Sequence, residues 1–286
     1  MSAGAGAAAE LGDLVEPNPP PSIAGGLGRM VRDVRRHHHL VANFISRDIR
    51  LKYRDSKLGY VWSILEPLLM TGVYVMLFTV IAGKPEPLYP LWVVIGVITW
   101  NFFGKALTGS LTALTGNEGI IKQVYFPRVL FAVTSVGSGG VMAVLSLLVA
   151  APFLVYHGIP PTAGLLLVPA GLLLTALLAM GLGLALACLN VVFRDAEFIL
   201  RFAVRAGFYL SPVMWTFHMV PKTRASVAIL LNPMAVPITM VRNGIDGSPL
   251  GISPGWVLYS VAVCAVTFVV GVCIFQRYEA GVVKSL

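Results

Sequence analysis

Apolar runs of membrane-spanning length recur along the chain. A helix needs about 20 mainly apolar residues to cross the hydrocarbon core of a bilayer. Segments of that kind lie at about 60–82, 91–115, 129–156, 164–192, 198–217 and 254–275. The fifth is the weakest, because Arg201 and Arg205 lie near its start. The sequence therefore predicts an all-α membrane protein that crosses the bilayer several times.

Charge is scarce and unevenly distributed. Only 12% of the 286 residues are charged, whereas ordinary soluble domains carry about 25%. The hydrophobic fraction is 57% and the mean hydropathy is +0.81. Nine of the 21 basic residues lie between Arg29 and Lys57, whereas a nucleic-acid binder carries its basic patch on a folded domain. Composition and charge placement exclude a soluble enzyme, a disordered protein and a nucleic-acid binder.

The chain divides into three parts. Residues 1–28 are rich in Ala and Gly, then in Pro, and lack the basic and apolar regions of a signal peptide. They are predicted to form a disordered cytoplasmic tail. Residues 29–57 contain an amphipathic helix with arginines on one face, followed by the approach to the first span. Such a helix lies in the membrane interface, or else packs on a soluble partner. Residues 58–286 form the transmembrane domain.

The basic residues also predict the orientation of the chain. Lys and Arg concentrate on the cytoplasmic side of membrane proteins. With six spans and the N-terminus inside, sixteen lie inside, four lie outside, and Lys105 lies within the membrane. Without the fifth span the division is seventeen to three. Charge therefore places the N-terminus in the cytoplasm but leaves five and six spans open.

Residues 218–253 differ from a simple loop. Their apolar stretches, 227–231 and 234–240, are too short to span and are interrupted by prolines. They are predicted to form short helices in the outer leaflet, if buried against protein, or a plain interfacial loop. The three cysteines and the run His37–His39 lack the spacing of disulfides or of a metal site, and no metal is predicted.

Several short stretches, in order along nearly the whole chain from Arg29, resemble one family. They are Arg47–Trp62, Glu66-Pro67-Leu68, Asn117–Arg128, Phe193-Arg194-Asp195, Ser211-Pro212, Met219-Val220-Pro221 and Leu231-Asn232-Pro233-Met234. Together they resemble the permease subunits of ABC-2-type exporters of lipid-linked polysaccharide, the family of O-antigen, teichoic-acid and cell-wall galactan exporters. A match to any single tripeptide would be weak evidence for the resemblance, but the ordered set of matches is specific to this family.

The resemblance implies a fold and partners. It implies six transmembrane helices with both termini in the cytoplasm of a bacterium, an N-terminal interface helix, and short outer-leaflet helices between spans five and six. It also implies a homodimer that binds a pair of ATP-binding-cassette subunits and exports a polyprenyl-diphosphate-linked glycan, with cell-wall galactan or O-antigen as candidate cargo. The sequence has no G-x-x-x-x-G-K-[ST] phosphate loop. ATP and Mg are therefore expected in a partner subunit, and this chain is not expected to be an enzyme.

The first candidate site is the segment 117–128, whose isoleucines and aromatics are expected to be exposed beside charged groups. An amphipathic helix that binds in a partner's groove needs such anchors, and the family resemblance makes this the ATPase-coupling helix. The predicted coupling residues are Glu118, Ile121, Lys122, Tyr125, Phe126, Pro127 and Arg128. An ordinary turn between spans, with its aromatics in the interface, is the alternative.

Three further groups of residues are candidates for contact with the cargo or for charge pairing. The residues that would attract the diphosphate are Arg50, Lys52, Arg54 and Lys57, which are equally well explained as topology signals. Glu66 and Lys105 are predicted to lie at similar depth and to pair, or to snorkel to headgroups. Because the resemblance places spans one and five around the channel, its candidate lining is Tyr74, Phe78, Tyr209, Trp215 and Phe217.

Other classes of protein fit the sequence less well. An ion-coupled secondary transporter or flippase of lipid-linked glycans usually carries several intramembrane carboxylates and repeated halves, whereas Glu66 stands alone. A membrane glycosyltransferase needs carboxylates near its donor, and Glu86 and Asp246 lie far apart in sequence. A structural scaffold agrees with composition alone.

Overall fold

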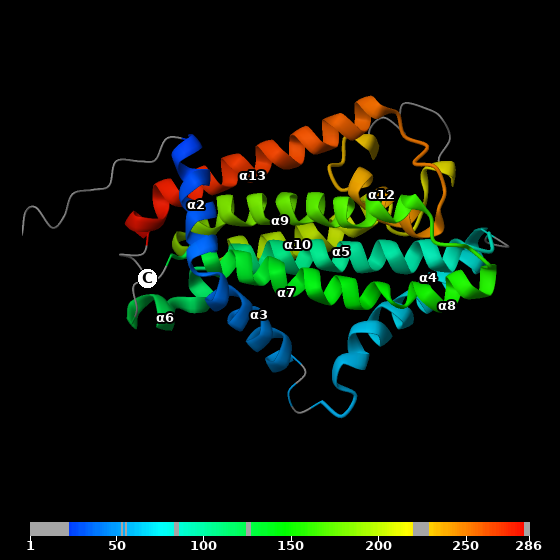
Figure 1. Ribbon diagram of the computed structural model, residues 1–286, viewed down its shortest axis with the longest axis horizontal. Helices are drawn as coiled ribbons and strands as arrows, with labels where there is room; N and C mark the ends of the chain where they lie inside the picture. The colour runs from blue at the N-terminus through cyan, green and yellow to red at the C-terminus, as the bar shows by residue number, and fades with distance from the viewer. Residues whose placement is uncertain are drawn as a thin grey trace, which may run out of the picture.

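The computed structural model describes residues 23–52, 54, 56–82, 86–123, 127–219 and 229–282. Within these ranges every regular element is a helix, and the long helices lie roughly side by side (Figure 1). The short helix α6 lies at one end of this bundle and α12 at the other. We call these the α6 end and the α12 end.

The elements follow one another along the chain as a series of α-helices with short 3-10 turns between them. They are α2 (Ile23–Arg36), α3 (His38–Lys52), η1 (Gly59–Val61), α4 (Trp62–Ala82), α5 (Tyr89–Leu111), η2 (Thr115–Asn117), α6 (Glu118–Gln123), α7 (Val129–Leu147), α8 (Ala150–His157), η3 (Ala163–Leu166), α9 (Leu167–Val192), α10 (Ala196–Leu210), η4 (Phe217–Met219), α12 (Ala235–Asp246) and α13 (Pro254–Val282).

Five helical segments are long and apolar enough to cross a membrane. They are Gly59–Leu77, Tyr89–Leu111, Val129–His157, Ala163–Val192 and Pro254–Glu279. These confirm five of the six predicted spans. The remaining one, 198–217, contains α10, whose 15 residues extend for about 22 Å, short of the roughly 30 Å of the hydrocarbon core. Helix α10 ends at Ser211 in an extended conformation, as is favoured before a proline. A sixth crossing remains a prediction.

Helix α5 is at the centre of the molecule. It packs against α4, α7, α9, α10 and α12, and 78% of its most apolar window is buried. The corresponding window of α4 is only 17% buried, and α4 presents large apolar side chains to the exterior, among them Val73, Met76 and Val80. Helix α4 is therefore a peripheral helix of this subunit.

Two prolines create polar contacts between helices. Pro67 in α4 has no N–H to donate to the carbonyl of Ser63 four residues earlier, and Ser146 Oγ of α7 donates to that carbonyl instead, at 2.8 Å. Pro233 precedes α12, and Ser260 Oγ of α13 donates to its carbonyl at 3.3 Å. Both contacts tie a helix or its start to a neighbouring helix.

Small residues allow α9 and α13 to approach closely. A Cβ atom added to Gly271 would lie 2.0 Å from the carbonyl oxygen of Gly181. A Cβ atom on Gly181 would lie 2.5 Å from the carbonyl oxygen of Thr267. Close backbone approach at small residues is a common way for membrane helices to associate, because lipid provides no hydrophobic drive.

The N-terminal amphipathic segment differs from its prediction as one helix starting at Arg29. Helix α2 already begins at Ile23, and a turn at His37 separates it from α3. Met30 and Val41 are buried in a cluster with residues of α7, α9 and α13, because α2 packs on α13 and α3 on α7. Part of the apolar face therefore contacts this chain's own spans, rather than lipid or a soluble partner.

The predicted short helix between the last two spans is present as α12. Eleven of its twelve residues are buried, all except Asp246, because it packs against α5 and α9. It ends at Gly247, whose φ of 74° suits glycine at a helix C-terminus. Residues 220–228 lie outside the described ranges.

Candidate functional site

A cavity of about 830 Å³ lies among α4, α5 and α10. Each helix contributes residues spaced by about one turn, so that one face lines the space. The lining comprises Glu66, Met70 and Tyr74 of α4, Val97, Trp100, Asn101, Gly104, Lys105, Thr108, Gly109 and Thr112 of α5 and its C-terminal turn, and Arg201, Val204, Arg205, Phe208 and Tyr209 of α10. Gly104 and Gly207 allow α5 and α10 to meet, because a Cβ atom on either would lie 3.0 Å from the other helix.

Aromatic rings gather toward the α12 end of the cavity. The ring centroids of Tyr74 and Phe208 are 5.4 Å apart, and those of Phe208 and Tyr209 are 5.3 Å apart. Trp100 meets the edge of Phe208 at 6.3 Å. Ring faces and edges give apolar contact without strict hydrogen-bond demands. This end of the cavity can therefore contact a flat ligand, or one that moves along the rings, through apolar surface.

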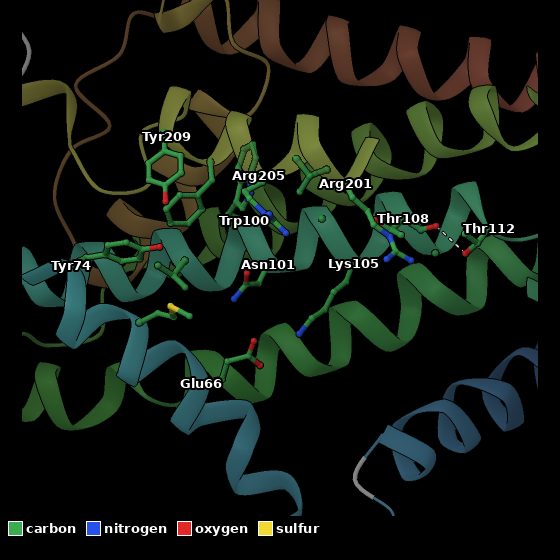
Figure 2. A pocket seen from close by; sticks show the side chains of 16 residues that line it. Glu66, Tyr74, Trp100, Asn101, Lys105, Thr108, Thr112, Arg201, Arg205 and Tyr209 are labelled. Carbon is green, nitrogen blue, oxygen red and sulfur yellow. Dashed lines mark hydrogen bonds between the residues drawn. The ribbon is translucent and has the colours of Figure 1, made fainter. Parts of the chain in front are cut away.

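Positive charge gathers toward the α6 end of the cavity. Lys105, Arg201 and Arg205 line it with a single carboxylate, Glu66, and Figure 2 shows these side chains around one opening. Glu197 forms an ion pair with Arg201 one helical turn away. With Glu66 and Glu197 both counted, three cations meet two carboxylates among the described residues. This part of the cavity therefore keeps a net positive charge and favours an anionic ligand.

Two of the predicted channel-lining residues are in this cavity, and others are elsewhere. Tyr74 and Tyr209 line it, from the two helices expected to do so. Trp215 and Phe217 pack edge to face on each other at 6.1 Å and are absent from the described lining, because the chain turns away after Ser211. The side chain of Phe78 lies outside the described part of the structure.

The predicted charged residues are also divided. Glu66 and Lys105 line this cavity together, as well as a smaller one beside it that Lys52 reaches. Arg54 and Lys57 are exposed. Arg50 donates from Nε to the carbonyl of Ser46 at 3.2 Å. Of the four residues predicted to attract diphosphate, Lys52 is thus the one that the described structure places beside the cavity.

The predicted coupling segment forms the short helix α6. Lys122 Nζ donates to Glu118 Oε1 at 2.6 Å, and this bond lowers the pKa of the Glu118 carboxyl, with a smaller contribution from Arg194. The sequence predicts that Ile120 and Ile121 are exposed, but both are half-buried. The apolar side of α6 packs against a cluster of buried apolar residues in the rest of this chain. Pro127 and Arg128 are half-buried, and Tyr125 and Phe126 lie outside the described residues.

Arg242 of α12 is a buried cation that holds the chain beyond α10. Its side chain is only 3% exposed. Its guanidinium donates to the carbonyls of Trp92 at 3.2 Å, Trp215 at 3.3 Å, Pro212 at 2.8 Å and Val213 at 3.1 Å. Tyr89 Oη adds a bond to the carbonyl of Met214 at 2.8 Å. We call these contacts the Arg242 clamp.

Sequence reasoning missed the roles of Arg201, Arg205, Trp100 and Phe208 in the cavity. The two arginines were counted as orientation signals that weaken a span. The sequence feature that could have identified them is the spacing of residues 201, 205 and 208. This spacing puts two arginines and an aromatic ring on one helix face. Which helix that face meets depends on packing, so the sequence alone did not identify a cavity.

Sequence comparison with known proteins finds a matching family and several relatives. The family described as ABC-2 type transporter matches residues 40–245. The O-antigen export system permease protein RfbA of Klebsiella pneumoniae is 27% identical over 84% of this chain and 92% of that protein. RfbA of Myxococcus xanthus is 29% identical over 74% and 82%. The polysialic acid transport protein KpsM of Escherichia coli is 26% identical over 84% and 93%. The matched residues run from α3 to α12 and include the whole cavity, and the chain belongs to the ABC-2 type transporter family.

Proposed function

We propose that this chain is the permease subunit of an ATP-driven exporter that moves a polyprenyl-diphosphate-linked polysaccharide across the bacterial cytoplasmic membrane. The observation that carries the proposal is the cavity, with its cations toward the α6 end and its rings toward the α12 end. A diphosphate is attracted by Lys105, Arg201 and Arg205, and sugar units slide along Tyr74, Trp100 and Tyr209. The relatives that match the chain include O-antigen export system permease proteins and a polysialic acid transport protein.

The α6 end is proposed to be cytoplasmic. Helix α2 and the end of α13 lie near this end (Figure 1). Helix α2 carries four arginines, in agreement with the concentration of basic residues on the cytoplasmic side. A cargo that approaches from the cytoplasm meets the cations first and the rings afterwards. Glu66 and Lys105 are proposed to form an ion pair at this mouth, since an isolated charge at membrane depth is costly.

A second copy of the chain is proposed to close the cavity. Helices α4 and α10 flank it and leave large apolar side chains exposed, among them Met76 and Phe202. Charged residues inside a membrane face a protein interior or water rather than lipid. A homodimer that brings the α4–α10 faces of its subunits together would keep Arg201, Arg205 and Glu66 away from lipid.

ATP hydrolysis is proposed to reach the cavity through α6. Glu118 lies within the electrostatic influence of Arg194, the residue that leads into α10. Asn190 Nδ2 at the end of α9 donates to Thr115 Oγ1 beside α6 at 3.3 Å. An ATPase subunit that pushes α6 would therefore move the start of α10, which carries Arg201. ATP and Mg would be held by a pair of such subunits.

Reconstitution tests the function. The chain is placed in liposomes with the ATP-binding-cassette subunit that co-purifies with it, and the lipid-linked glycan is loaded on the ATPase side. We expect glycan to appear on the opposite leaflet only with hydrolysable ATP, and at the same rate when ionophores dissipate ion gradients. Transport that follows a gradient without ATP would instead identify an ion-coupled transporter.

Charge exchange within α6 tests the coupling. Lys122→Glu should weaken association with the ATPase roughly thirtyfold, as loss of an interface anchor of about 2 kcal/mol does. Exchanging both charges, Glu118→Lys with Lys122→Glu, restores the internal ion pair but reverses the surface charges. Because an exposed pair of this kind stabilises a helix by only about 0.3–0.5 kcal/mol, we expect the exchange to remain defective in co-purification. Recovery in the exchanged protein would show that only the internal pair matters.

A further inference from the structure

A groove runs beneath α2 where this helix crosses the long helices. Its volume is about 340 Å³. Its walls include Val34 of α2, Val136 of α7, Leu177 and Met180 of α9, and Phe268 of α13. Arg35 is the one charged residue among the described residues that line it. All the walls that α7, α9 and α13 contribute belong to candidate membrane spans, so an acyl chain in this groove would contact apolar helices.

A second, open groove adjoins the first along α2. It is lined by Gly28, Val31, Arg32, Arg35 and Arg36, which recur at helical spacing and so share one face. Val31 and Arg35 line both grooves, which makes the two continuous. Val31 is 48% exposed although it is apolar. We call the two grooves together the α2 seat.

The positive charge of the α2 seat has no protein counter-charge in the described part of the chain. The ion pairs there join Arg47 to Asp48, Lys122 to Glu118 and Arg201 to Glu197, and none includes an arginine of the seat. The one carboxylate of α2, Asp33, is on a different face, where it interacts electrostatically with Glu279 of α13. Arg32, Arg35 and Arg36 are exposed, so an anion can approach all three.

We propose that the α2 seat binds an anionic phospholipid, with an acyl chain in the apolar groove and the phosphate on Arg32, Arg35 and Arg36. A soluble anion would leave the apolar groove empty. Phosphatidylcholine is disfavoured, because its quaternary ammonium would lie near three positively charged guanidinium groups. A basic residue near an anionic lipid surface strengthens binding roughly fivefold. A lipid in this seat joins α2 to α7, α9 and α13 and fixes where the interface helix lies.

Lipid titration followed by native mass spectrometry tests the seat. The delipidated full-length protein is titrated with phosphatidylglycerol and with phosphatidylcholine of the same acyl chains. We expect phosphatidylglycerol to bind at least tenfold more tightly to one site. The variant R32Q/R35Q/R36Q should lose this preference, whereas R47Q/R277Q, which removes exposed arginines from α3 and α13, should keep it.

The apolar groove is tested separately. Ala176→Trp fills the groove and should weaken both lipids at least fivefold, while Val266→Trp, on the exposed surface of α13, should not. Val31→Asn, at a half-exposed position, provides the same test if the tryptophan variant does not fold. Equal affinity for the two lipids would overturn the proposal. Full competition by glycerophosphoglycerol, together with no effect of Ala176→Trp, would also overturn it. If undecaprenyl phosphate displaced phosphatidylglycerol at a tenfold lower concentration, the seat would instead be assigned to a cargo-type lipid.

Discussion

Neutralising the cations of the cavity is expected to stop export while the protein still inserts and binds its ATPase. In the triple variant K105Q/R201Q/R205Q, the cavity keeps its rings and its size but loses the charges that face Glu66. Each cation near a phosphate contributes roughly a fivefold gain in binding. We therefore expect at least a tenfold fall in the rate of glycan transfer in proteoliposomes, and accumulation of lipid-linked glycan in cells.

The control for this prediction removes cations that lie elsewhere. Arg47 pairs with Asp48 on α3, and Arg277 stacks over Tyr278 near the end of α13. The variant R47Q/R277Q should export normally. The conservative variant R201K/R205K should retain part of the activity, because Lys keeps the charge but not the planar fork that binds phosphate through two bonds. Normal export by the triple glutamine variant would contradict the role assigned to the cavity.

A double-mutant cycle on Glu66 and Lys105 separates their ion pair from the general positive charge. If the two groups pair, Glu66→Gln and Lys105→Gln together should cost less than the sum of the single changes. Additive losses would mean that each acts alone. Export rate and thermal stability are both measured, since the two need not respond alike.

Loss of the Arg242 clamp is expected to cause the largest fall in stability. In Arg242→Met, the carbonyls of Trp92, Pro212, Val213 and Trp215 lose their donor in a buried site. A buried acceptor left without a partner costs about 1–3 kcal/mol. We expect a clear fall in the Tm of the purified protein, with faster proteolysis in the segment 211–219.

The matched control is Arg277→Gln, which changes an exposed arginine at the other end of the molecule. This variant should leave the Tm unchanged. Arg242→Lys keeps the charge but has a single nitrogen where the guanidinium offers a fork of donors, so it should be only partly stabilising. If Arg242→Met had the same Tm as the unmodified protein, the four hydrogen bonds would not be needed to hold the chain beyond α10.

Much of this architecture could be predicted because it depends on local composition. An apolar run of about 20 residues has few alternatives to a transmembrane helix, and five such runs are spans in the structure. The prolines and brief apolar stretches of the segment 218–253 predict short helices or an interfacial loop, and the structure has the short helix α12 there. The proline in Ser211-Pro212 limits a helix wherever it occurs, but the prediction placed it inside a span, whereas α10 ends there.

The sequence by itself determined the class of protein, because scarcity of charge and the length of apolar runs are independent of how the helices meet. It also predicted an intramembrane pair of Glu66 and Lys105. The family resemblance made Tyr74 and Tyr209 candidates for the channel lining. Only the tertiary structure decided that Arg201 and Arg205 line a cavity and that Arg242 is buried. The physical reason is that a charged side chain is exposed or buried according to what its helix packs against. Those contacts can join residues far apart in the sequence, 150 positions in the case of Arg242 and Trp92.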